Sequence, residues 1–382
     1  MRRPKGLLLI LVLCLSQPLW SQMRYYRGNV HTHTTNSDGE LSPMNAVMKY
    51  KNLGYDFCAI TDHNKIIDTS PFERMADFMV IGGEEYTAYF HVSALDLKIP
   101  LDPSGGYGDG INAIYKASAL PILNHPIWPP RVPANFIVQQ TNLRHMEIHN
   151  GLVQDQEGFD NQFLWDQVLS AGKKIWGVAS DDAHRTSDYG RAWIMVNAHS
   201  RDRDVILSAI RRGQYYCSTG VFLDEISLKP GEIKIASRNG QFIRFIGQNR
   251  TVLDSVYSNR AVYRYKGNEN YVRVEISNRN GQMAWTQPLI FNDWTQPCLL
   301  AVSGDNQFQF AQKSLEKPLR VQVRDLLDRP VSGKKVYFMV IKGNSRLNNS
   351  TFLEVVSDAN GFAQAAPTMG TTPGERDRKS VV

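Results

Sequence analysis

Residues 24–40, RYYRGNVHTHTTNSDGE, begin as a strand-like segment and continue as a polar one. His31 and His33 are one residue apart directly after the strand-like part, and Asp38 follows shortly afterwards. In an extended segment the side chains at positions i and i+2 point to the same side, so both imidazoles can face one metal ion. The stretch therefore predicts a strand whose end begins a metal site.

From this stretch as far as Cys217, short apolar segments alternate with helical ones. Ser42 is an expected N-cap and Pro43 an expected first helical residue. Alternation of this kind predicts a largely parallel sheet, open or closed into a barrel. Gly54, Gly172 and Gly213 each follow a helical segment, as glycines with a left-handed backbone do. The expected helices cover residues 42–53, 111–119, 160–171 and 203–212, and the expected strands are RYYRGNV, DFCAI, FMVI, FHVSAL, LPIL, HMEI, KIWGVAS and AWIMVN.

Polar residues with metal-binding side chains recur where these apolar segments end. In parallel β/α architectures such strand ends converge on one face, where the active site lies. Positions far apart in the sequence are therefore expected to form one cluster. Its members are His31 and His33 after RYYRGNV, His63 after DFCAIT, Glu84 and Glu85 after FMVIGG, His125 after LPILN, and Asp182 and His184 after KIWGVAS.

The residue types indicate which metals the cluster would take. Imidazole and carboxylate together suit Zn, Mn or Fe, and the lack of thiolates in the set disfavours a structural zinc site. The ligands exceed the needs of one ion, so several ions are expected. The i, i+2 rule selects Asp182 rather than Asp181 as the partner of His184. Asp62 faces away from His63 and is expected to hydrogen-bond or cap rather than to bind metal.

The motifs HTH, TDH, GGEEYT, NHP and DDAH together resemble the PHP superfamily, named for polymerase and histidinol phosphatase, over roughly residues 24–220. Within it the sequence is most similar to exported CehA/McbA-like metallohydrolases. The resemblance implies an α/β fold, a distorted (β/α)7 barrel, with two or three divalent ions. The implied metal ligands are His31, His33, Asp38, His63, Glu85, His91, His125, Asp182 and His184.

Three positions keep alternatives. Either Glu84 or Glu85 is the bridging carboxylate, and the G-x-E spacing of the family selects Glu85. His149, in MEIHN, is an extra polar group expected in the cleft, where it or an unliganded His91 would protonate a leaving group. One of the two arginines after the DDAH motif, Arg185 or Arg191, would clamp an anionic substrate. The candidate catalytic residues are accordingly His149 and Arg191.

The activity that the resemblance implies is hydrolysis by a hydroxide that the metal ions hold, with a small phosphoester as substrate. Hydrolysis of carboxyl or carbamate esters is the alternative within the same chemistry. A non-catalytic protein that contacts surfaces or glycans is the alternative outside it. We find no nucleophile elbow, Walker loop or dinucleotide fingerprint in the sequence.

The N-terminal residues 1–22, MRRPKGLLLILVLCLSQPLWSQ, have the pattern of a cleaved signal peptide, with an uncleaved anchor as the alternative. We therefore expect a periplasmic or extracellular protein with no membrane span after cleavage. The formal charge of the 382-residue chain is +6, and three of those charges belong to this segment, which leaves +3. That value is too low to indicate nucleic-acid binding. Cys58 is expected to be a buried thiol.

After Gly220 the pattern changes to short β-rich runs with turn signals such as SRNG and SNRNGQ. Residues 23–220 are the expected metallohydrolase domain and residues 221–300 a β-rich accessory domain. Residues 301–382 form an expected Ig-like β segment, and either this module is incomplete or its tail departs from the family. Within them, VQVRDLLDRPVSGKKVYF and SDANGFAQA resemble bacterial Ig-like modules of the invasin/intimin group, which implies surface or glycan contact.

Overall fold

The computed structural model describes residues 23–75, 77–104, 107–153, 161–229, 231–290, 298–303, 309–324, 329–342, 344–371 and 378–381. The expected signal segment, residues 1–22, lies outside them. No helix of the described part has the length and apolar character needed to cross a bilayer.

The first half of the chain alternates strands and helices in the expected way. Its strands are β1 (Arg24–Asn29), β2 (Phe57–Ile60), β3 (Met79–Thr87), β4 (His91–Leu95), β5 (Leu120–Leu123), β6 (His145–Asn150), β7 (Trp176–Ser180), β8 (Trp193–Ala198) and β9 (Tyr215–Ser218). Its helices are α1 (Pro43–Asn52), α2 (Tyr107–Lys116), α3 (Ala134–Gln139), α4 (Asn161–Ser170) and α5 (Arg203–Arg211), with the 3-10 turn η1 (Ser70–Phe72).

Helix ends follow the local chemistry of the sequence. The Ser42 hydroxyl accepts a hydrogen bond from the Asn45 amide at the start of α1, and Pro43 occupies the first turn, so the predicted N-terminus is confirmed. The predicted left-handed glycines are confirmed, with φ of +77° at Gly54, +86° at Gly172 and +71° at Gly213. Helix α3 was not expected, because it has only six residues and no side-chain cap.

A second group of strands continues from the first half without a break in the sheet. It consists of β10 (Leu223–Lys229), β11 (Glu232–Ser237), β12 (Phe242–Ile246), β13 (Val252–Val256), β14 (Arg260–Arg264), β15 (Tyr271–Ser277), β16 (Met283–Thr286) and β17 (Leu289–Ile290), with the 3-10 turn η2 (Gln248–Arg250). The largest sheet has the strand order β13-β12-β15-β16-β9-β8-β1-β2-β3-β4-β5-β6-β7. Residues on either side of position 220 therefore share one sheet.

The expected closed (β/α)7 barrel is not confirmed, because the described strands form an open path that ends at β7 and β13. Among the described residues β9 pairs with β16 and forms no ladder with β7, although the Cys217 thiol of β9 donates to the Gly177 carbonyl of β7 at 3.2 Å. The prediction of a largely parallel sheet is wrong, because neighbouring strands are parallel only in the pairs β1–β2, β2–β3, β5–β6 and β6–β7 among the described strands, and antiparallel elsewhere. The chain beyond β7 still meets the chain beyond β1, because the His33 amide donates to the Ala183 carbonyl at 3.0 Å.

A buried ionic network joins α4 to the second group of strands. The Arg273 guanidinium is fully buried and donates to both carboxylate oxygens of Asp166, at 2.8 and 2.5 Å, and to Glu275 at 2.7 Å. The Tyr271 hydroxyl also donates to Asp166, at 2.7 Å. Because these charges are away from water, their mutual pairing fixes how β15 sits on α4. Cys58 is a buried free thiol, as predicted.

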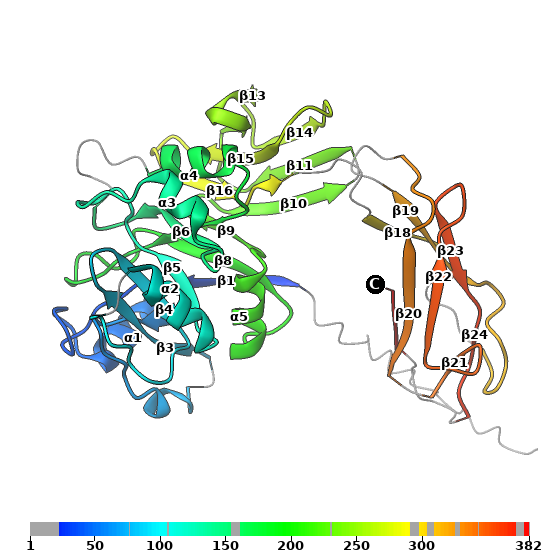
Figure 1. The fold of residues 1–382 in the computed structure, drawn as a ribbon, viewed down its shortest axis with the longest axis horizontal. Helices are drawn as coiled ribbons and strands as arrows, with labels where there is room; N and C mark the ends of the chain where they lie inside the picture. The colour runs from blue at the N-terminus through cyan, green and yellow to red at the C-terminus, as the bar shows by residue number, and fades with distance from the viewer. Residues whose placement is uncertain are drawn as a thin grey trace, which may run out of the picture.

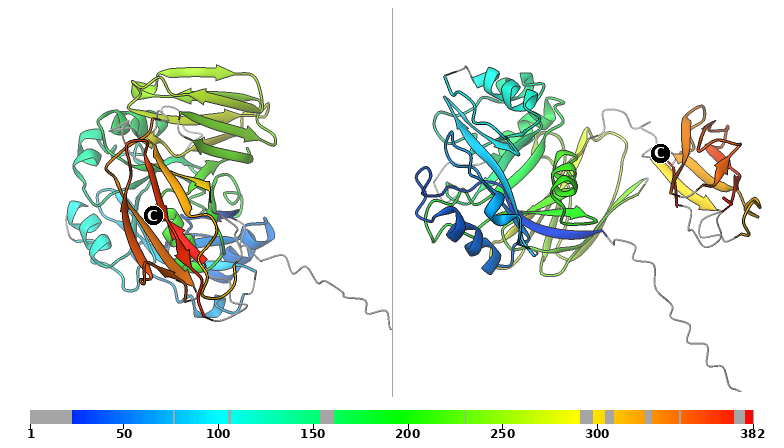
Figure 2. Two further views of the ribbon diagram at one scale, coloured as in Figure 1. Left: turned by 90° about the vertical axis from the view of Figure 1, so that its right-hand side faces the viewer. Right: turned by 90° about the horizontal axis from the view of Figure 1, so that it is seen from below.

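The C-terminal strands form a separate lobe with its own core (Figures 1 and 2). They are β18 (Cys298–Ser303), β19 (Leu319–Arg324), β20 (Lys335–Lys342), β21 (Arg346–Leu347), β22 (Phe352–Val356), β23 (Phe362–Ala365), β24 (Pro367–Thr368) and β25 (Arg378–Val381). Two three-stranded sheets, β18-β19-β23 and β22-β20-β25, pack around Val321, Val323, Val336 and Phe338. The Ig-like resemblance of this segment stays a prediction.

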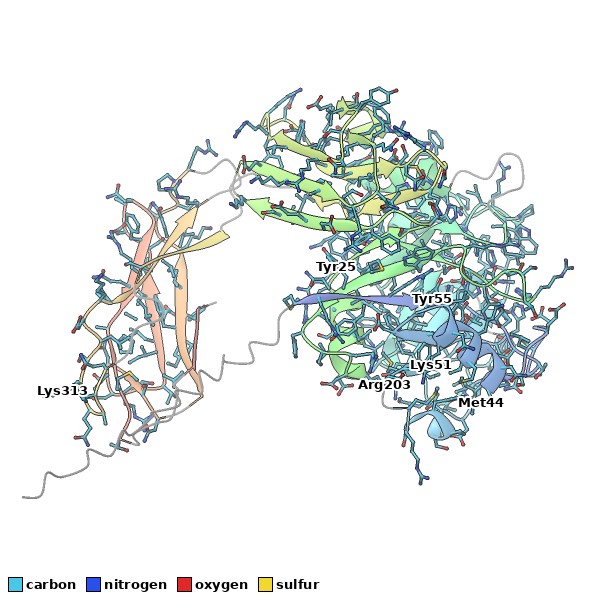
Figure 3. The ribbon with its side chains drawn as sticks, turned by 180° about the vertical axis from the view of Figure 1, so that it is seen from behind. Tyr25, Met44, Lys51, Tyr55, Arg203 and Lys313 are labelled. Atoms are coloured by element: carbon cyan, nitrogen blue, oxygen red, sulfur yellow. The ribbon has the colours of Figure 1, made fainter. Side chains whose placement is uncertain are left out.

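Figure 3 shows the ribbon from behind with its side chains, and labels Tyr25, Met44, Lys51, Tyr55, Arg203 and Lys313. Met44 and Lys51 lie on α1, and the Lys51 ammonium contacts the Asp77 carboxylate at 2.6 Å. Arg203, at the start of α5, pairs with Asp96. Tyr25 and Tyr55 lie on the same lobe, whereas Lys313 lies on the C-terminal one.

Candidate metal centre

The nine predicted ligands come together at one edge of the large sheet. Each has a nitrogen or oxygen within 3.6 Å of another member. His91 joins them although it begins a strand, because β4 runs antiparallel to β3 and pairs His91 with Thr87. The cluster consists of His31, His33, Asp38, His63, Glu85, His91, His125, Asp182 and His184.

Glu85 lies at the centre of the cluster. Its Oε1 is 3.1 Å from His91 Nδ1 and 3.3 Å from His125 Nε2. Its Oε2 is 2.9 Å from His63 Nδ1 and 3.4 Å from His33 Nε2. A carboxylate with different histidines around its two oxygens has the placement of a bridging ligand.

Glu84 points the other way and accepts a hydrogen bond from the Leu101 amide at 3.1 Å. Burial raises the pKa of Glu84 to about 7. The structure therefore distinguishes the two glutamates in the way that the family spacing selects, with Glu85 facing the histidines.

Asp182 closes the cluster on the side of β7. Its Oδ1 is 3.1 Å from His31 Nε2 and 3.2 Å from His33 Nε2. Its backbone φ of +53° lies in the left-handed region, which turns the carboxylate inward. Asp181 faces away and accepts from three backbone amides, those of residues 190, 191 and 192. The distinction that the i, i+2 rule made between the two aspartates is thus seen in the structure.

The turn after His33 brings Asp38 over the cluster. The Gly39 amide donates to the Thr34 carbonyl at 2.9 Å, and a side chain at position 39 would lie 2.4 Å from the His33 carbonyl oxygen. Asp38 Oδ1 is then 3.4 Å from His184 Nε2, and its Oδ2 is 3.5 Å from His63 Nε2. Asp38 is half exposed, so this side of the cluster is open to solvent.

Asp62 supports the turn, as expected of a capping carboxylate. It accepts from the Thr34 amide, the Thr34 hydroxyl and the Ser37 hydroxyl, each at 2.7 Å. These bonds hold the segment between His33 and Asp38 in place.

Three overlapping groups of donor atoms could each hold a cation, and within each group the atoms lie within 4.8 Å of one another. His33 belongs to two groups and so does His63, which links the three into one extended site. The groups are His33, Asp38, His63 and His184; His31, His33 and Asp182; and His63, Glu85 and His91.

Opposite charges shift the protonation of the cluster strongly. Burial opposes the charged form of His31, yet the surrounding carboxylates raise the pKa of its imidazole well above the usual value. Burial would likewise raise the pKa of Glu85, but the neighbouring histidines, led by His31, lower it well below its usual range. Burial lowers the pKa of His33. The pKa values of the neighbouring imidazoles of His31 and His33 are therefore shifted in opposite directions.

Two buried oxygens test whether the residues fit metal ions. Glu85 Oε2 and Asp182 Oδ1 lie away from solvent and accept no well-aligned hydrogen bond within the described residues, although imidazole nitrogens surround both. Buried carboxylate oxygens of this kind are costly unless a cation or a protonated imidazole meets them. His31 Nε2 and His33 Nε2 also face each other at 3.1 Å. Oxygen and imidazole lone pairs that converge in this way suit divalent cations.

Glu147 is a buried member of the site that the sequence analysis missed. Its Oε1 accepts from His31 Nδ1 at 2.8 Å and from the Ser180 hydroxyl, and its Oε2 accepts from the His125 amide at 2.6 Å and from Asn150 at 2.8 Å. It therefore orients His31 and holds the backbone of His125. A carboxylate between the two apolar residues of the strand segment HMEI was the available signal.

Asn124, before His125, was also missed. Its amide nitrogen donates to Glu85 Oε1 at 2.7 Å and lies 3.3 Å from His31 Nε2. Trp128 closes the same side, with its ring centroid 5.4 Å from that of His125 and 6.1 Å from that of His91. The indole therefore borders the cluster on the side of His91 and His125.

The two predicted catalytic residues lie together, but outside the three ligand groups. The His149 ring is 5.4 Å from that of Trp285. The Arg191 guanidinium donates to the Gly151 carbonyl at 2.9 Å and pairs with Asp188 at 3.1 Å. Both line a hollow of about 270 Å³. A bulge in β6 between Glu147 and His149 is the reason that one faces the cluster and the other the hollow.

His145, at the start of β6, is buried, although histidines are more often found at the surface or at a strand edge. Its Nε2 donates to the Ile210 carbonyl at 3.0 Å, so the His145 side chain packs against α5.

A family model described as PHP-associated matches residues 170–215. This segment runs from the end of α4 to the start of β9 and contains Asp182 and His184. No curated protein matches the chain. The match supports a relation to the PHP superfamily over these residues.

Three solved structures are similar to the chain. A two-domain protein from Bacteroides vulgatus, with a predicted PHP-like metal-dependent phosphoesterase, has 15% identity, covers 87% of this chain and 95% of its own, and gives a TM-score of 0.44. A candidate metal-dependent phosphoesterase from Bifidobacterium adolescentis has 14% identity, coverages of 41% and 87%, and a TM-score of 0.34. An amidohydrolase from Chromobacterium violaceum with bound sulfate has 12% identity, coverages of 41% and 87%, and a TM-score of 0.31.

Proposed function

We propose that the chain is a metal-dependent hydrolase that acts on phosphoester bonds. The observation that carries the proposal is the linked set of three ligand groups, in which His33 and His63 are shared. Linked groups of this kind can hold two or three divalent ions close together. Sites with neighbouring ions are used to stabilise both the attacking and the leaving oxygen in phosphoester cleavage.

Bound ions would supply a water of lowered pKa and offset the negative charge that develops on the substrate. The protein itself contributes the ligands and holds them in position. Glu85 and Asp182 are the buried anions of the site, and Glu147 fixes the ring of His31 through its Nδ1 proton. Trp128 walls one side of the cluster, while the half-exposed Asp38 marks the open side.

The hollow beside the cluster gives His149 and Arg191 a place in the proposal. Asn150 lies between His149 and Gly151, which line the hollow, and its amide donates to Asp182 Oδ2 at 3.1 Å. We propose that the leaving group of a bound substrate extends into this hollow. There Arg191 would bind an anionic portion, and His149 would donate a proton to the departing oxygen.

The phosphoester class is supported by the PHP-associated match over residues 170–215. Export is part of the proposal and is supported by the signal-like residues 1–22. The natural partner would then be a small phosphoester outside the cytoplasm.

The test combines metal analysis with a substrate panel. The chain from residue 23 onward is purified, its bound metal is counted by mass spectrometry, and turnover is measured on aryl phosphates, aryl phosphodiesters, nucleotides, naphthyl esters and carbamates. His31→Ala removes a buried member of the cluster, and His199→Ala is the matched control, because His199 is exposed and belongs to none of the three groups.

We expect bound Zn, Mn or Fe, and phosphoester turnover that His31→Ala lowers by at least about 100-fold, which is the scale on which a single electrostatic group contributes. His199→Ala should leave turnover unchanged. Activity on esters or carbamates alone would replace the phosphoester assignment with the alternative one. Absence of both metal and turnover would refute the enzyme and favour a non-catalytic surface protein.

A further inference from the structure

Two turns on the accessory strands carry the same four residues, RNGQ, at 238–241 and at 279–282. The first joins β11 to β12 and the second joins β15 to β16. Because β12 pairs with β15, with Phe242 opposite Ser277, the two turns lie next to each other at one edge of the sheet. A direct contact links them, since Arg279 Nε donates to Gln241 Oε1 at 2.9 Å.

Both turns are held rigidly by their own side chains. The Asn239 amide donates to the Gly220 carbonyl at 2.7 Å, and its oxygen accepts from the Phe222 amide at 2.9 Å. In the second turn, Asn278 Oδ1 accepts from the amides of Asn280 and Gln282, at 3.0 and 3.1 Å. A surface fixed before a ligand arrives loses little conformational freedom on binding.

The turns wall a hollow of about 510 Å³ with residues 257–259 on its remaining side. Its lining includes two arginines, Arg238 and Arg279, and no carboxylate or aliphatic side chain. Arg238 is paired outside the lining, at 2.9 Å from Asp224, whereas the contact of Arg279 with Gln241 is to a neutral amide. The lining therefore favours an anion that also carries many hydrogen-bonding groups.

Tyr257 adds a flat apolar face to this polar lining. Its side chain is 87% exposed, and one face of its ring stacks on Phe242 at a centroid distance of 4.5 Å. The stacking fixes the ring while its other face stays available. An aromatic ring next to arginine and amide groups can pack against the CH face of a ring-shaped ligand while the polar groups bind its substituents.

We propose that this hollow binds an anionic saccharide, such as a sugar phosphate, with the anion at Arg279 and the sugar ring on Tyr257. The volume of about 510 Å³ far exceeds what an inorganic ion needs and lies in the range of small-molecule sites. The saccharide class follows from the lining, because hydroxyl groups match amides and arginines, whereas an apolar ligand would find one ring only.

The hollow is a second site at the same edge of the sheet as the metal centre, and the second RNGQ turn contributes Arg279 to it and Asn280, Gly281 and Gln282 to the hollow of about 270 Å³ beside His149. Register places Gly28 opposite Ile194, Trp193 opposite Ser218 and Ser218 opposite Ala284. The RNGQ turns therefore lie at the edge of the sheet where β1 ends and the chain continues to His31. Five strand spacings separate β1 from β12, which corresponds to roughly 24 Å.

Binding is measured by isothermal titration calorimetry on the chain from residue 23 onward. The probes are glucose 6-phosphate, glucose, inorganic phosphate and AMP. The variants are Arg279→Gln, which removes the charge, and Tyr257→Ala, which removes the exposed ring. Arg264→Gln is the matched control, because Arg264 is also an exposed arginine, lies at the end of β14 remote from residues 257–259, and pairs with Glu232. The titration is repeated with Asp182→Asn, which impairs the metal centre alone.

We expect glucose 6-phosphate to bind more tightly than glucose, phosphate or AMP, and Arg279→Gln to weaken it by about tenfold, the scale of a charged hydrogen bond. Tyr257→Ala should weaken it as well, while Arg264→Gln and Asp182→Asn leave it within about twofold. Equal binding of inorganic phosphate, or tighter binding of AMP, would overturn the saccharide class. Loss of binding in Asp182→Asn, or no binding to the unmodified chain, would overturn the site.

Discussion

Glu147→Gln tests how the metal centre is ordered, because this change alters hydrogen-bonding capacity with almost no change in shape. The carboxylate only accepts, and it receives two hydrogen bonds on each oxygen. The Oε2 side faces the backbone amide of His125, which cannot become an acceptor. The glutamine oxygen must therefore take the Oε2 position, and its NH2 group must take the Oε1 position.

That orientation places an amide NH2 group against His31 Nδ1, 2.8 Å away in the unmodified protein. The ring can remain hydrogen-bonded only by presenting a lone pair at Nδ1, which moves its proton to Nε2. Nε2 is the atom that faces Glu85 at 3.3 Å and Asp182 at 3.1 Å. A protonated Nε2 cannot bind a metal, so the variant loses one ligand without losing the residue.

The expected loss of metal affinity is 10- to 100-fold, or about 1.4–2.8 kcal/mol, as for other carboxylates that orient a metal-binding histidine. Affinity is measured by competition with a fluorescent chelator. Glu84→Gln is the matched control, because Glu84 is also buried, faces away from the cluster and has a pKa raised to about 7. Metal affinity of Glu147→Gln within twofold of the unmodified protein, with Glu84→Gln equally unchanged, would refute the tautomer argument.

Three further outcomes follow from the same contacts. Removing metal with a chelator should lower the melting temperature in calorimetry, because bound metal at 100 times its dissociation constant stabilises by about 2.7 kcal/mol, and re-addition of metal should restore it. Burial lowers the pKa of His145 to about 4 from 6.5, so between these values the unfolded chain binds a proton that the folded chain does not. Stability should therefore fall by up to about 3 kcal/mol as the pH drops from 6.5 towards 4, and His145→Gln should flatten this slope in urea titrations at each pH. Arg273→Met leaves Asp166 buried without its cation and should cost about 3–5 kcal/mol in urea unfolding, and Arg264→Met at the surface should cost under about 1 kcal/mol.

Much of the site could be predicted because its ligands follow a rule that is visible in the sequence. His31, His63 and His125 each come just after an apolar strand, and strand ends on one face of a sheet meet. Glu147 escaped this rule, since it lies within a strand. In a regular strand the side chains of Glu147 and His149 would point to the same side, but the bulge in β6 turns them to different sides.

Closure of the sheet could not be predicted for a different reason. Whether the sheet continues beyond β9 depends on its pairing with β16. The contact between Thr219, just after β9, and Met283, in β16, joins residues that are 64 positions apart in the sequence. No local pattern encodes a pairing over such a distance. His145 shows the same limit, because its burial depends on α5, which supplies the Ile210 carbonyl.

The crowding of the cluster itself favours cations as its occupants. Asp182 and Glu85 are buried acids, and without metal only protonated histidines can offset them. His31 takes that role, since its pKa is held well above the usual value. A divalent ion must displace this proton, so metal binding is coupled to proton release and weakens as the pH falls. The neighbouring His33, whose pKa burial lowers, gives up its proton more readily, and its Nε2 lies 3.2 Å from the same Asp182 oxygen. Without metal, His31 therefore balances the charge of the carboxylates, whereas His33 loses its proton more easily and can bind a cation. Glu147 orients the His31 ring with and without metal.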